Sequence, residues 1–258
     1  MTTLHLGRDW ELGDPLDDGI GGFGQVFHTR ADEIDAVAKL VPKVPGAERE
    51  LLSPEGLEGV RNIVPVIDLG QHEDNWVLVM PKAETSLAAY LREVGHPLDA
   101  VEALPILLDV CDALAGLDGR VVHRDLKPSN VLLLDGRWCL ADFGIARYAD
   151  ASTEANTRKF AMTPHYAAPE QWRLEHATSA TDVYSFGVMA FELVMGRRPF
   201  DGSPEELREA HLHEVPPPLE GASSALATVV TQCLLKAPGS RPRPGDLRRR
   251  LERSAQSP

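Results

Sequence analysis

The segment richest in reactive groups is His123-Arg-Asp125-Leu-Lys127-Pro-Ser-Asn130, which combines a carboxylate, a cation and an amide. Asp125 could orient an incoming hydroxyl group and accept its proton. Lys127 could neutralise the charge of a phosphoryl group in transfer, and the amide oxygen of Asn130 could ligate a metal ion. These residue types in one short stretch indicate phosphoryl transfer.

A second acidic residue follows twelve residues after Asn130, in the sequence Asp142-Phe143-Gly144. It comes directly after an apolar run over residues 138–141 that predicts a strand. An exposed aspartate at the end of a strand suits Mg²⁺, which prefers few carboxylates together with water and substrate phosphates. We therefore predict that Asn130 and Asp142 are the metal ligands.

A glycine-rich stretch near the N-terminus, Gly19-Ile-Gly21-Gly-Phe23-Gly24-Gln-Val26, follows the pattern G-x-G-x-x-G-x-V. Glycine permits backbone conformations with positive φ and lets amide groups approach phosphate oxygens closely. The pattern alone is weak, because a tight turn in a hairpin has the same composition.

Lys39 ends the run Ala36-Val37-Ala38-Lys39, within a predicted strand over residues 34–41. A lysine on an alternating strand usually points to water, but after a glycine-rich loop it could lie over nucleotide phosphates. Such a lysine needs an acidic partner. Glu50, on a short helix predicted over 47–58, is the first choice, and Glu48 and Glu58 remain alternatives.

The composition describes a folded, acidic protein. The chain has 258 residues, 43% of them hydrophobic and 25% charged, which leaves room for one large domain or two packed lobes. Its net charge of −13 argues against a nucleic-acid binder or an anionic-membrane binder. Residues 241–253 carry six arginines against two acids, which we interpret as a basic helix face.

Cysteines and terminal segments suggest the compartment. Cys111, Cys139 and Cys233 lie in apolar runs without metal-ligand spacing, which predicts small core residues in a reducing environment. The N-terminus does not read as a signal peptide, and no apolar run reaches the length of a membrane span. We therefore expect a soluble, cytoplasmic protein.

Elements with different periodicities must position these residues. Strands are predicted at 25–29, 34–41, 63–69 and 75–80, and helices over 99–115, 181–195, from Ser203 onward, 224–236 and 244–253. The predicted fold class is α+β. A β-rich lobe with one short helix, residues 1–83, precedes a larger, mainly helical lobe, residues 84–258, with a hinge near 81–84.

Together these motifs resemble the protein-kinase superfamily, and the chain looks most like a Hanks-type (eukaryotic-like) bacterial serine/threonine protein kinase. The resemblance covers roughly residues 10–253. Ala168-Pro-Glu170 is similar to the end of the family's activation segment, and Asp182-Val-Tyr-Ser-Phe-Gly187 to its central buried helix. Arg241 stands where the family places the ion-pair partner of that glutamate. The resemblance implies a bilobal protein-kinase-like fold.

The resemblance also implies roles. Asp125 would be the catalytic base, Lys127 would contact the γ-phosphate, and Lys39, held by Glu50, would contact the α- and β-phosphates. ATP would be the phosphate donor, with Mg²⁺ or Mn²⁺ at Asn130 and Asp142. Met80 would be the gatekeeper beside the adenine, which would bond to the backbone near Pro81 and Ala83. The implied nucleotide-binding set is Gly19, Ile20, Gly21, Gly22, Phe23, Gly24, Val26, Ala38, Lys39, Met80, Pro81, Ala83 and Leu132.

Regulation is expected in the loop 145–167. We predict autophosphorylation at Thr157 first and Thr153 second, although both could be ordinary loop hydroxyls. Thr163 is expected to form a hydroxyl hydrogen bond to Asp125 or Lys127. Asp18 and Met162 depart from the family pattern, which puts adenine packing and substrate docking in doubt at those two positions.

Three functions remain open. The implied one is an active kinase that phosphorylates serine or threonine in protein substrates, because Lys127 is typical of that class. It would involve no nucleic acid and no membrane span, but it could include an activating partner or a homodimer. A pseudokinase that binds ATP and partners without transfer is the alternative. A small-molecule kinase is the third, and the complete activation segment argues against it.

Overall fold

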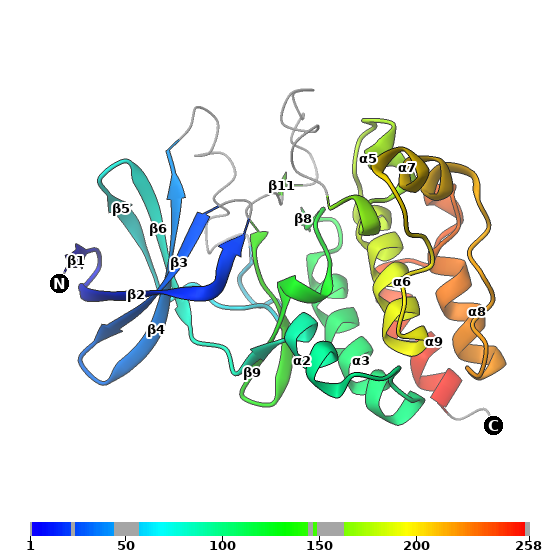
Figure 1. The fold of residues 1–258 in the computed structure, drawn as a ribbon, viewed down its shortest axis with the longest axis horizontal. Helices are drawn as coiled ribbons and strands as arrows, with labels where there is room; N and C mark the ends of the chain where they lie inside the picture. The colour runs from blue at the N-terminus through cyan, green and yellow to red at the C-terminus, as the bar shows by residue number, and fades with distance from the viewer. Residues whose placement is uncertain (1, 22–23, 44–56, 144–146, 149–162, 256–258) are drawn as a thin grey trace.

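The computed structural model describes residues 2–21, 24–43, 57–143, 147–148 and 163–255. Its N-terminal part is an antiparallel sheet with strand order β1-β2-β3-β4-β6-β5. Figure 1 shows this sheet, in blue to cyan, at one end of the molecule and the helices at the other. The strands are β1 (Thr2–His5), β2 (Asp9–Gly21), β3 (Gly24–Ala31), β4 (Ile34–Pro42), β5 (Asp68–His72) and β6 (Asn75–Pro81).

The strand predictions hold where apolar and β-branched residues alternate, in β3, β4 and β6. The strand predicted over 63–69 is wrong for most of its length. Ile63 forms only an isolated parallel bridge with Leu140, the amide of Val64 donates to the carbonyl of Leu140 at 2.8 Å, and β5 begins at Asp68. Val64 is buried against Cys139 and Ala141 instead, while Ile67 is 37% exposed. The helix predicted over 47–58 lies almost wholly outside the described residues.

Asp68 ties the N-terminal hairpin to the far edge of the sheet. Its carboxylate accepts hydrogen bonds from the amides of Gly7 and Arg8 and, at 2.9 Å, from Nε1 of Trp10. These bonds lower the pKa of Asp68, although partial burial opposes them. A Cβ atom at Gly70 would lie 2.7 Å from a terminal methyl of Leu6, so any larger residue would displace that side chain. The hairpin thereby covers the edge strand β5.

The C-terminal part is mainly helical, as expected. Two short sheets join it: β7 (Thr85–Ser86) with β9 (Val131–Leu134) and β10 (Arg137–Leu140), and β8 (Val121–Val122) with β11 (Arg147–Tyr148). The helices are α2 (Leu87–Val94), α3 (Ala100–Leu117), α5 (Pro169–Trp172), α6 (Ser179–Met195), α7 (Pro204–His213), α8 (Ser224–Cys233) and α9 (Pro244–Ala255). Single 3₁₀ turns occur at Pro128–Asn130, Pro164–Tyr166 and Pro238–Ser240.

Two predicted helix starts are confirmed by their caps. Asp99 accepts hydrogen bonds from the amides of Val101 and Glu102, and Glu102 bonds back to the amide of Asp99. Ser203 and Glu206 form the same reciprocal box at the start of α7, with proline at its first position. Each box satisfies backbone donors that a helix end leaves free, so the chain itself fixes where α3 and α7 begin.

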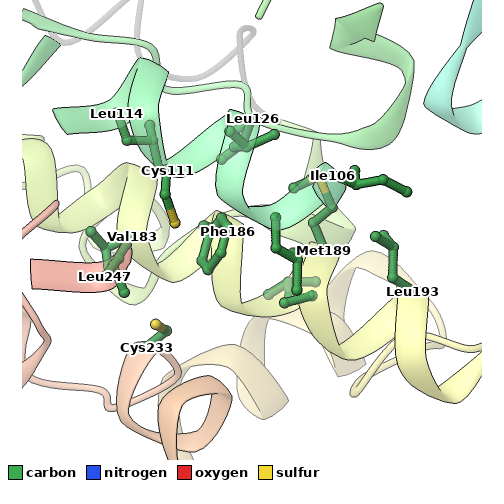
Figure 2. Close-up of a cluster of buried hydrophobic side chains, with 14 of the residues drawn as sticks. Ile106, Cys111, Leu114, Leu126, Val183, Phe186, Met189, Leu193, Cys233 and Leu247 are labelled. Atoms are coloured by element: carbon green, nitrogen blue, oxygen red, sulfur yellow. The ribbon is translucent and has the colours of Figure 1, made fainter. Parts of the chain in front are cut away.

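The helices enclose one large apolar core. Figure 2 shows its centre, where Phe186 and Met189 of α6 lie between α3 and the C-terminal helices. Cys111 and Cys233 are fully buried in this core, and Cys139 is buried nearby, which confirms the three cysteines as small packing residues. Gly187 belongs to the same helix, and a Cβ there would lie 2.7 Å from the Cβ of Cys233. The central helix is therefore held on every side.

Arginines of helix α9 form ion pairs with acidic residues of the same protein. Arg248 lies 2.6 Å from the buried carboxylate of Asp112 in α3 and 2.9 Å from Glu252. Arg249 pairs with Asp246. The basic face predicted at 241–253 is thus partly neutralised by acids of α3 and α9. Within the described part of the chain, no helix is both long enough and apolar enough to cross a bilayer.

Candidate active site

The segment that follows β8 begins at His123 and is held by hydrogen bonds to the central helix, α6. The carboxylate of Asp182 in α6 accepts hydrogen bonds from the amides of His123 and Arg124, both at 2.8 Å. Complete burial raises the pKa of Asp182, and these two amides and the nearby His123 and Arg124 side chains partly offset the effect. The carbonyl of Arg124 in turn accepts a hydrogen bond from Gln171 at 2.8 Å. The backbone on either side of Asp125 is therefore fixed.

His123 supports the loop rather than facing solvent. The ring is fully buried, its Nε2 atom lies 2.9 Å from the carbonyl of Ala141, and its Nδ1 atom accepts from the amide of Asp125 at 3.3 Å. The ring also packs 4.9 Å from Phe143, measured between centroids. These contacts fix the His123 ring between the loop of Asp125 and the residues that follow β10.

Asp125 and Lys127 meet at one hydroxyl group. The Oγ1 atom of Thr163 donates to Oδ1 of Asp125 at 2.6 Å, and Nζ of Lys127 donates to the same Oγ1 at 2.8 Å. Lys127 also lies 2.7 Å from Oδ2 of Asp125. The predicted hydroxyl hydrogen bond of Thr163 is confirmed, and it reaches both partners. A carboxylate and an ammonium thus face one side-chain alcohol.

Asn130 and Asp142 are brought together by the backbone. Nδ2 of Asn130 donates to the carbonyl of Asp125 at 2.8 Å and to Oδ2 of Asp125 at 3.1 Å, so its amide oxygen is the atom that would ligate a cation. The amide of Ala141, next to Asp142, donates to the carbonyl of Asn130 at 2.8 Å. One amide oxygen and one carboxylate are a donor set that fits Mg²⁺ with water and phosphate as further ligands.

Lys39 reaches this group from the sheet. Its Nζ atom lies 2.5 Å from Oδ1 of Asp142, and only 9% of the lysine side chain is exposed. The lysine therefore points inward and not to water. Its predicted partner Glu50, like the alternative Glu48, lies outside the described residues. No contact between Lys39 and the remaining alternative, Glu58, is found among the described residues.

Strand register decides which side chains share the face of Lys39. Directly paired residues lie on one face, and Lys39 pairs with Val26 and Leu78, while Val37 pairs with Met80. Val26, Val37 and Met80 therefore share the face of Lys39. Met80 packs there with Leu132, which comes from β9.

Ala38 does not belong to this face, so its prediction as a nucleotide contact is wrong. It packs on the opposite face with Leu4 and Trp10. Successive strand residues alternate between faces, and the sequence Ala-Val-Ala-Lys did not reveal which alanine or valine would be turned inward. Val37 lies on the face of Lys39 where Ala38 does not, and the cross-strand register is the signal that identifies it.

The glycine-rich stretch forms the end of a hairpin. β2 includes Gly19, Ile20 and Gly21, and Gly21 pairs with Gly24 at the start of β3. Gly24 has a φ of 144°, and a Cβ there would lie 2.4 Å from the carbonyl oxygen of Leu40. Only glycine fits that position. Gly22 and Phe23 at the tip lie outside the described residues.

The link from the sheet to the helical part is short. β6 ends at Pro81, and after Lys82 and Ala83 the amide of Glu84 donates to the carbonyl of Leu133 at 2.9 Å. This bond fixes the end of the link to β9, the strand that carries Leu132. Pro81 and Ala83 therefore lie between the strand of Met80 and the strand of Leu132.

Glu170 and Arg241 form a buried bidentate ion pair. The two guanidinium nitrogens lie 2.7 and 2.9 Å from the carboxylate oxygens. Arg241 also donates to the carbonyls of Leu235, Ala180 and Lys236, and Glu170 accepts from Thr181. Every N–H donor of the Arg241 guanidinium thus has an acceptor. A buried ion pair needs such complete hydrogen bonding to offset the cost of removing its charges from water.

Tyr166, in the turn that follows Thr163, makes a second, partly buried contact with the central helix. The hydroxyl of Tyr166 donates to Oε2 of Glu192 in α6 at 2.5 Å, and burial raises the pKa values of both groups. The contact anchors the turn that carries Thr163 to the central helix. The predicted phosphorylation sites Thr153 and Thr157 lie outside the described residues.

Comparison with known proteins identifies the family. The model of the protein kinase domain matches residues 18–250. The chain is 43% identical over 274 residues to the serine/threonine-protein kinase PkaA of Streptomyces coelicolor, which covers 95% of this chain and 50% of that protein. It is 36% identical over 185 residues to PrkC of Bacillus subtilis, covering 70% of this chain and 28% of PrkC.

The serine/threonine-protein kinase PknB of Mycobacterium leprae is 33% identical over 269 residues, covering 93% of this chain and 42% of that protein. The chain thus spans half or less of the length of these three relatives. The family match begins near the end of β2 and reaches into α9, so it includes every described residue of the site. The chain therefore belongs to the protein kinase family, in its Hanks-type serine/threonine branch.

Proposed function

We propose that this chain transfers the γ-phosphate of ATP to serine or threonine hydroxyls of protein substrates. The observation that carries the proposal is the contact of Thr163 with Asp125 and Lys127. A side-chain alcohol of the kind that would be phosphorylated already fits between the carboxylate and the ammonium. The same three residue types are what phosphoryl transfer to an alcohol requires.

Asp125 would orient the acceptor hydroxyl and take its proton. In a loose transition state the proton leaves late, so orientation is the larger part of this role. Lys127 would neutralise the charge of the phosphoryl group between donor and acceptor oxygens. The hydrogen bonds to Asp182, His123 and Asn130 support this assignment, because they hold the loop in place before any substrate binds.

Asn130 and Asp142 would hold Mg²⁺, which would neutralise phosphate charge when bound. Among the described ranges, no group of three or more His, Cys, Asp or Glu side chains could hold a metal. A site with few protein ligands is what Mg²⁺ takes when phosphates and water complete its shell. Mn²⁺ is the proposed substitute, because it accepts the same oxygen ligands.

The nucleotide would lie between the two parts of the chain. Lys39 would contact the α- and β-phosphates, and the apolar side chains of Val26, Val37, Met80 and Leu132 would surround the base. Glycine amides at 19–24 would approach the phosphates, and the backbone at Pro81 and Ala83 would bond the adenine. We propose the boundary between the lobes at residue 83, in the link that follows β6.

The test is phosphate transfer from radiolabelled ATP to myelin basic protein by the wild type and by Asp125→Asn. The variant keeps the shape of the side chain and removes its charge, so we expect a rate loss of about a hundredfold or more, in the range of positioned acid–base groups. Asp118→Asn, an exposed aspartate at the end of α3, is the matched control and keeps the wild-type rate. Equal background turnover in the wild type and Asp125→Asn would favour an ATP-binding scaffold.

Three finer assignments belong to the same proposal. Thr157 and then Thr153 are the proposed autophosphorylation sites, and phosphopeptide mass spectrometry without phosphate between residues 150 and 163 would refute them. Buried, unpaired cysteines and the need for ATP favour the cytoplasm. An activating partner or a homodimer stays a prediction.

A further inference from the structure

The connection between α7 and α8 carries a run of three prolines that the proposed function does not use. Its sequence is Glu214-Val-Pro-Pro-Pro-Leu-Glu220. Figure 1 shows this connection on the outer side of the helical part, at the end away from the sheet. The segment is therefore far from the residues that would bind nucleotide.

Proline chemistry fixes the conformation of this segment. Each proline holds its own φ near −65°, and each residue that precedes a proline is driven out of the helical region. Glu214, at the end of α7, already has φ −82° and ψ 146°, close to the polyproline II values of about −75° and +145°. Proline chemistry predicts the same geometry for residues 215–217, a left-handed helix with three residues per turn.

Burial follows that three-residue period. Val215 is 85% exposed, and Pro218, three residues later, is also exposed. Pro216 is half-buried, and Leu219, three residues after it, is only 7% exposed and packs in the main core. One face of the segment is therefore anchored in the protein. The opposite face presents Val215 and Pro218 to solvent as an apolar ridge.

We infer that this ridge, Val215 and Pro218, docks a separate protein domain that has an aromatic-lined groove for polyproline II segments. Such grooves bind prolines that are already extended, because little conformational entropy is then lost. The exposed acids Glu214 and Glu220 flank the ridge, so the complementary groove has basic residues at both ends. The anchored Leu219 and the cap of α7, in which the amide of Glu214 donates to Ala210 at 3.0 Å, keep the ridge presented outward.

The test measures binding of the whole chain to a purified EVH1 domain and a purified WW domain by calorimetry. Both domains recognise proline-rich segments in aromatic-lined grooves. We expect binding by at least one of them, and we expect Val215→Ser to weaken it about tenfold, the factor for loss of one buried valine contact. Reversing both acids, with Glu214→Lys and Glu220→Lys, weakens binding more at low salt than at high salt.

Val101→Ser is the matched control, because Val101 is an 81% exposed valine in the first turn of α3. It leaves the affinity unchanged. Absence of binding to both domains at millimolar concentrations would overturn the inference, and so would equal affinities of Val215→Ser and the wild type. Concentration-dependent self-association of the chain that Val215→Ser abolishes would also overturn it, because the ridge would then bind a second copy.

Discussion

Protonation of a buried histidine is expected to limit stability in acid. His211 of α7 is fully buried, its Nδ1 atom lies 3.0 Å from the hydroxyl of Tyr184, and its ring lies against Trp172 and Phe200. Burial lowers the pKa of His211 from 6.5 to about 3, and the nearby cation of Lys236 acts in the same direction. The folded protein therefore holds this imidazole neutral, while the unfolded chain protonates it below pH 6.5.

The sign and size of the effect follow from proton linkage. Because the unfolded state binds the proton first, stability falls as the pH drops from 6.5 toward 3. At pH 4.5 the unfolded histidine is almost fully protonated and the folded one almost fully neutral. Because pH 4.5 lies about two units below the pKa of the unfolded histidine, the unfolding free energy is about 2.5 kcal/mol lower there than at pH 7.

The measurement is urea unfolding of the wild type and His211→Gln at pH 7 and at pH 4.5. Glutamine removes the titration, so the free-energy loss between the two pH values should be about 2.5 kcal/mol smaller in the variant. Carboxylates titrate equally in both proteins and cancel in this comparison. The variant His213→Gln replaces an exposed histidine two positions further along α7, and it should lose as much stability as the wild type. Equal losses in His211→Gln and the wild type would refute the reasoning.

Two further substitutions test contacts around the site. Glu170→Gln leaves the guanidinium of Arg241 buried without its counter-charge, and we expect a loss of about 3–5 kcal/mol in unfolding free energy by urea titration; a loss below 1 kcal/mol would contradict it. Gly24→Ala forces a Cβ to 2.4 Å from the carbonyl of Leu40, so we expect weaker ATP binding by calorimetry, whereas Gly245→Ala, which has open space around it, should bind as the wild type does.

The sequence predicts the site where chemistry and local pattern coincide. Asp125, Lys127 and Asn130 lie within six residues, so their proximity needs no knowledge of the fold. The starts of α3 and α7 were also predictable, because a capping box is a local signal. The hydroxyl contact of Thr163 was expected on the resemblance to a family and not on spacing.

Contacts that depend on register could not be predicted in the same way. Ala38 and Val37 are both small apolar residues, and only the pairing of β4 with β6 decides which of them faces Lys39. Residues 63–67 have the composition of a strand, but Ile63 forms only a bridge with Leu140 and Val64 is buried against Cys139 of β10. In both cases the local sequence is compatible with two arrangements, and contacts with residues distant in sequence determine which one forms.

Lys39 and Asp142 neutralise each other, so neither of these two site charges is left unpaired. The residues are 103 positions apart, Lys39 on β4 and Asp142 two residues after β10, so their contact joins the sheet to the helical part. Their side chains are 9% and 27% exposed, and an ammonium or a carboxylate left alone at such burial would be strongly destabilising. In the proposed function, the ammonium of Lys39 would neutralise nucleotide phosphate, and the carboxylate of Asp142 would neutralise the bound metal. Binding of the magnesium nucleotide would therefore replace the Lys39–Asp142 pair with a Lys39–phosphate pair and an Asp142–metal pair. The sheet and the helical part would stay linked through the ligand.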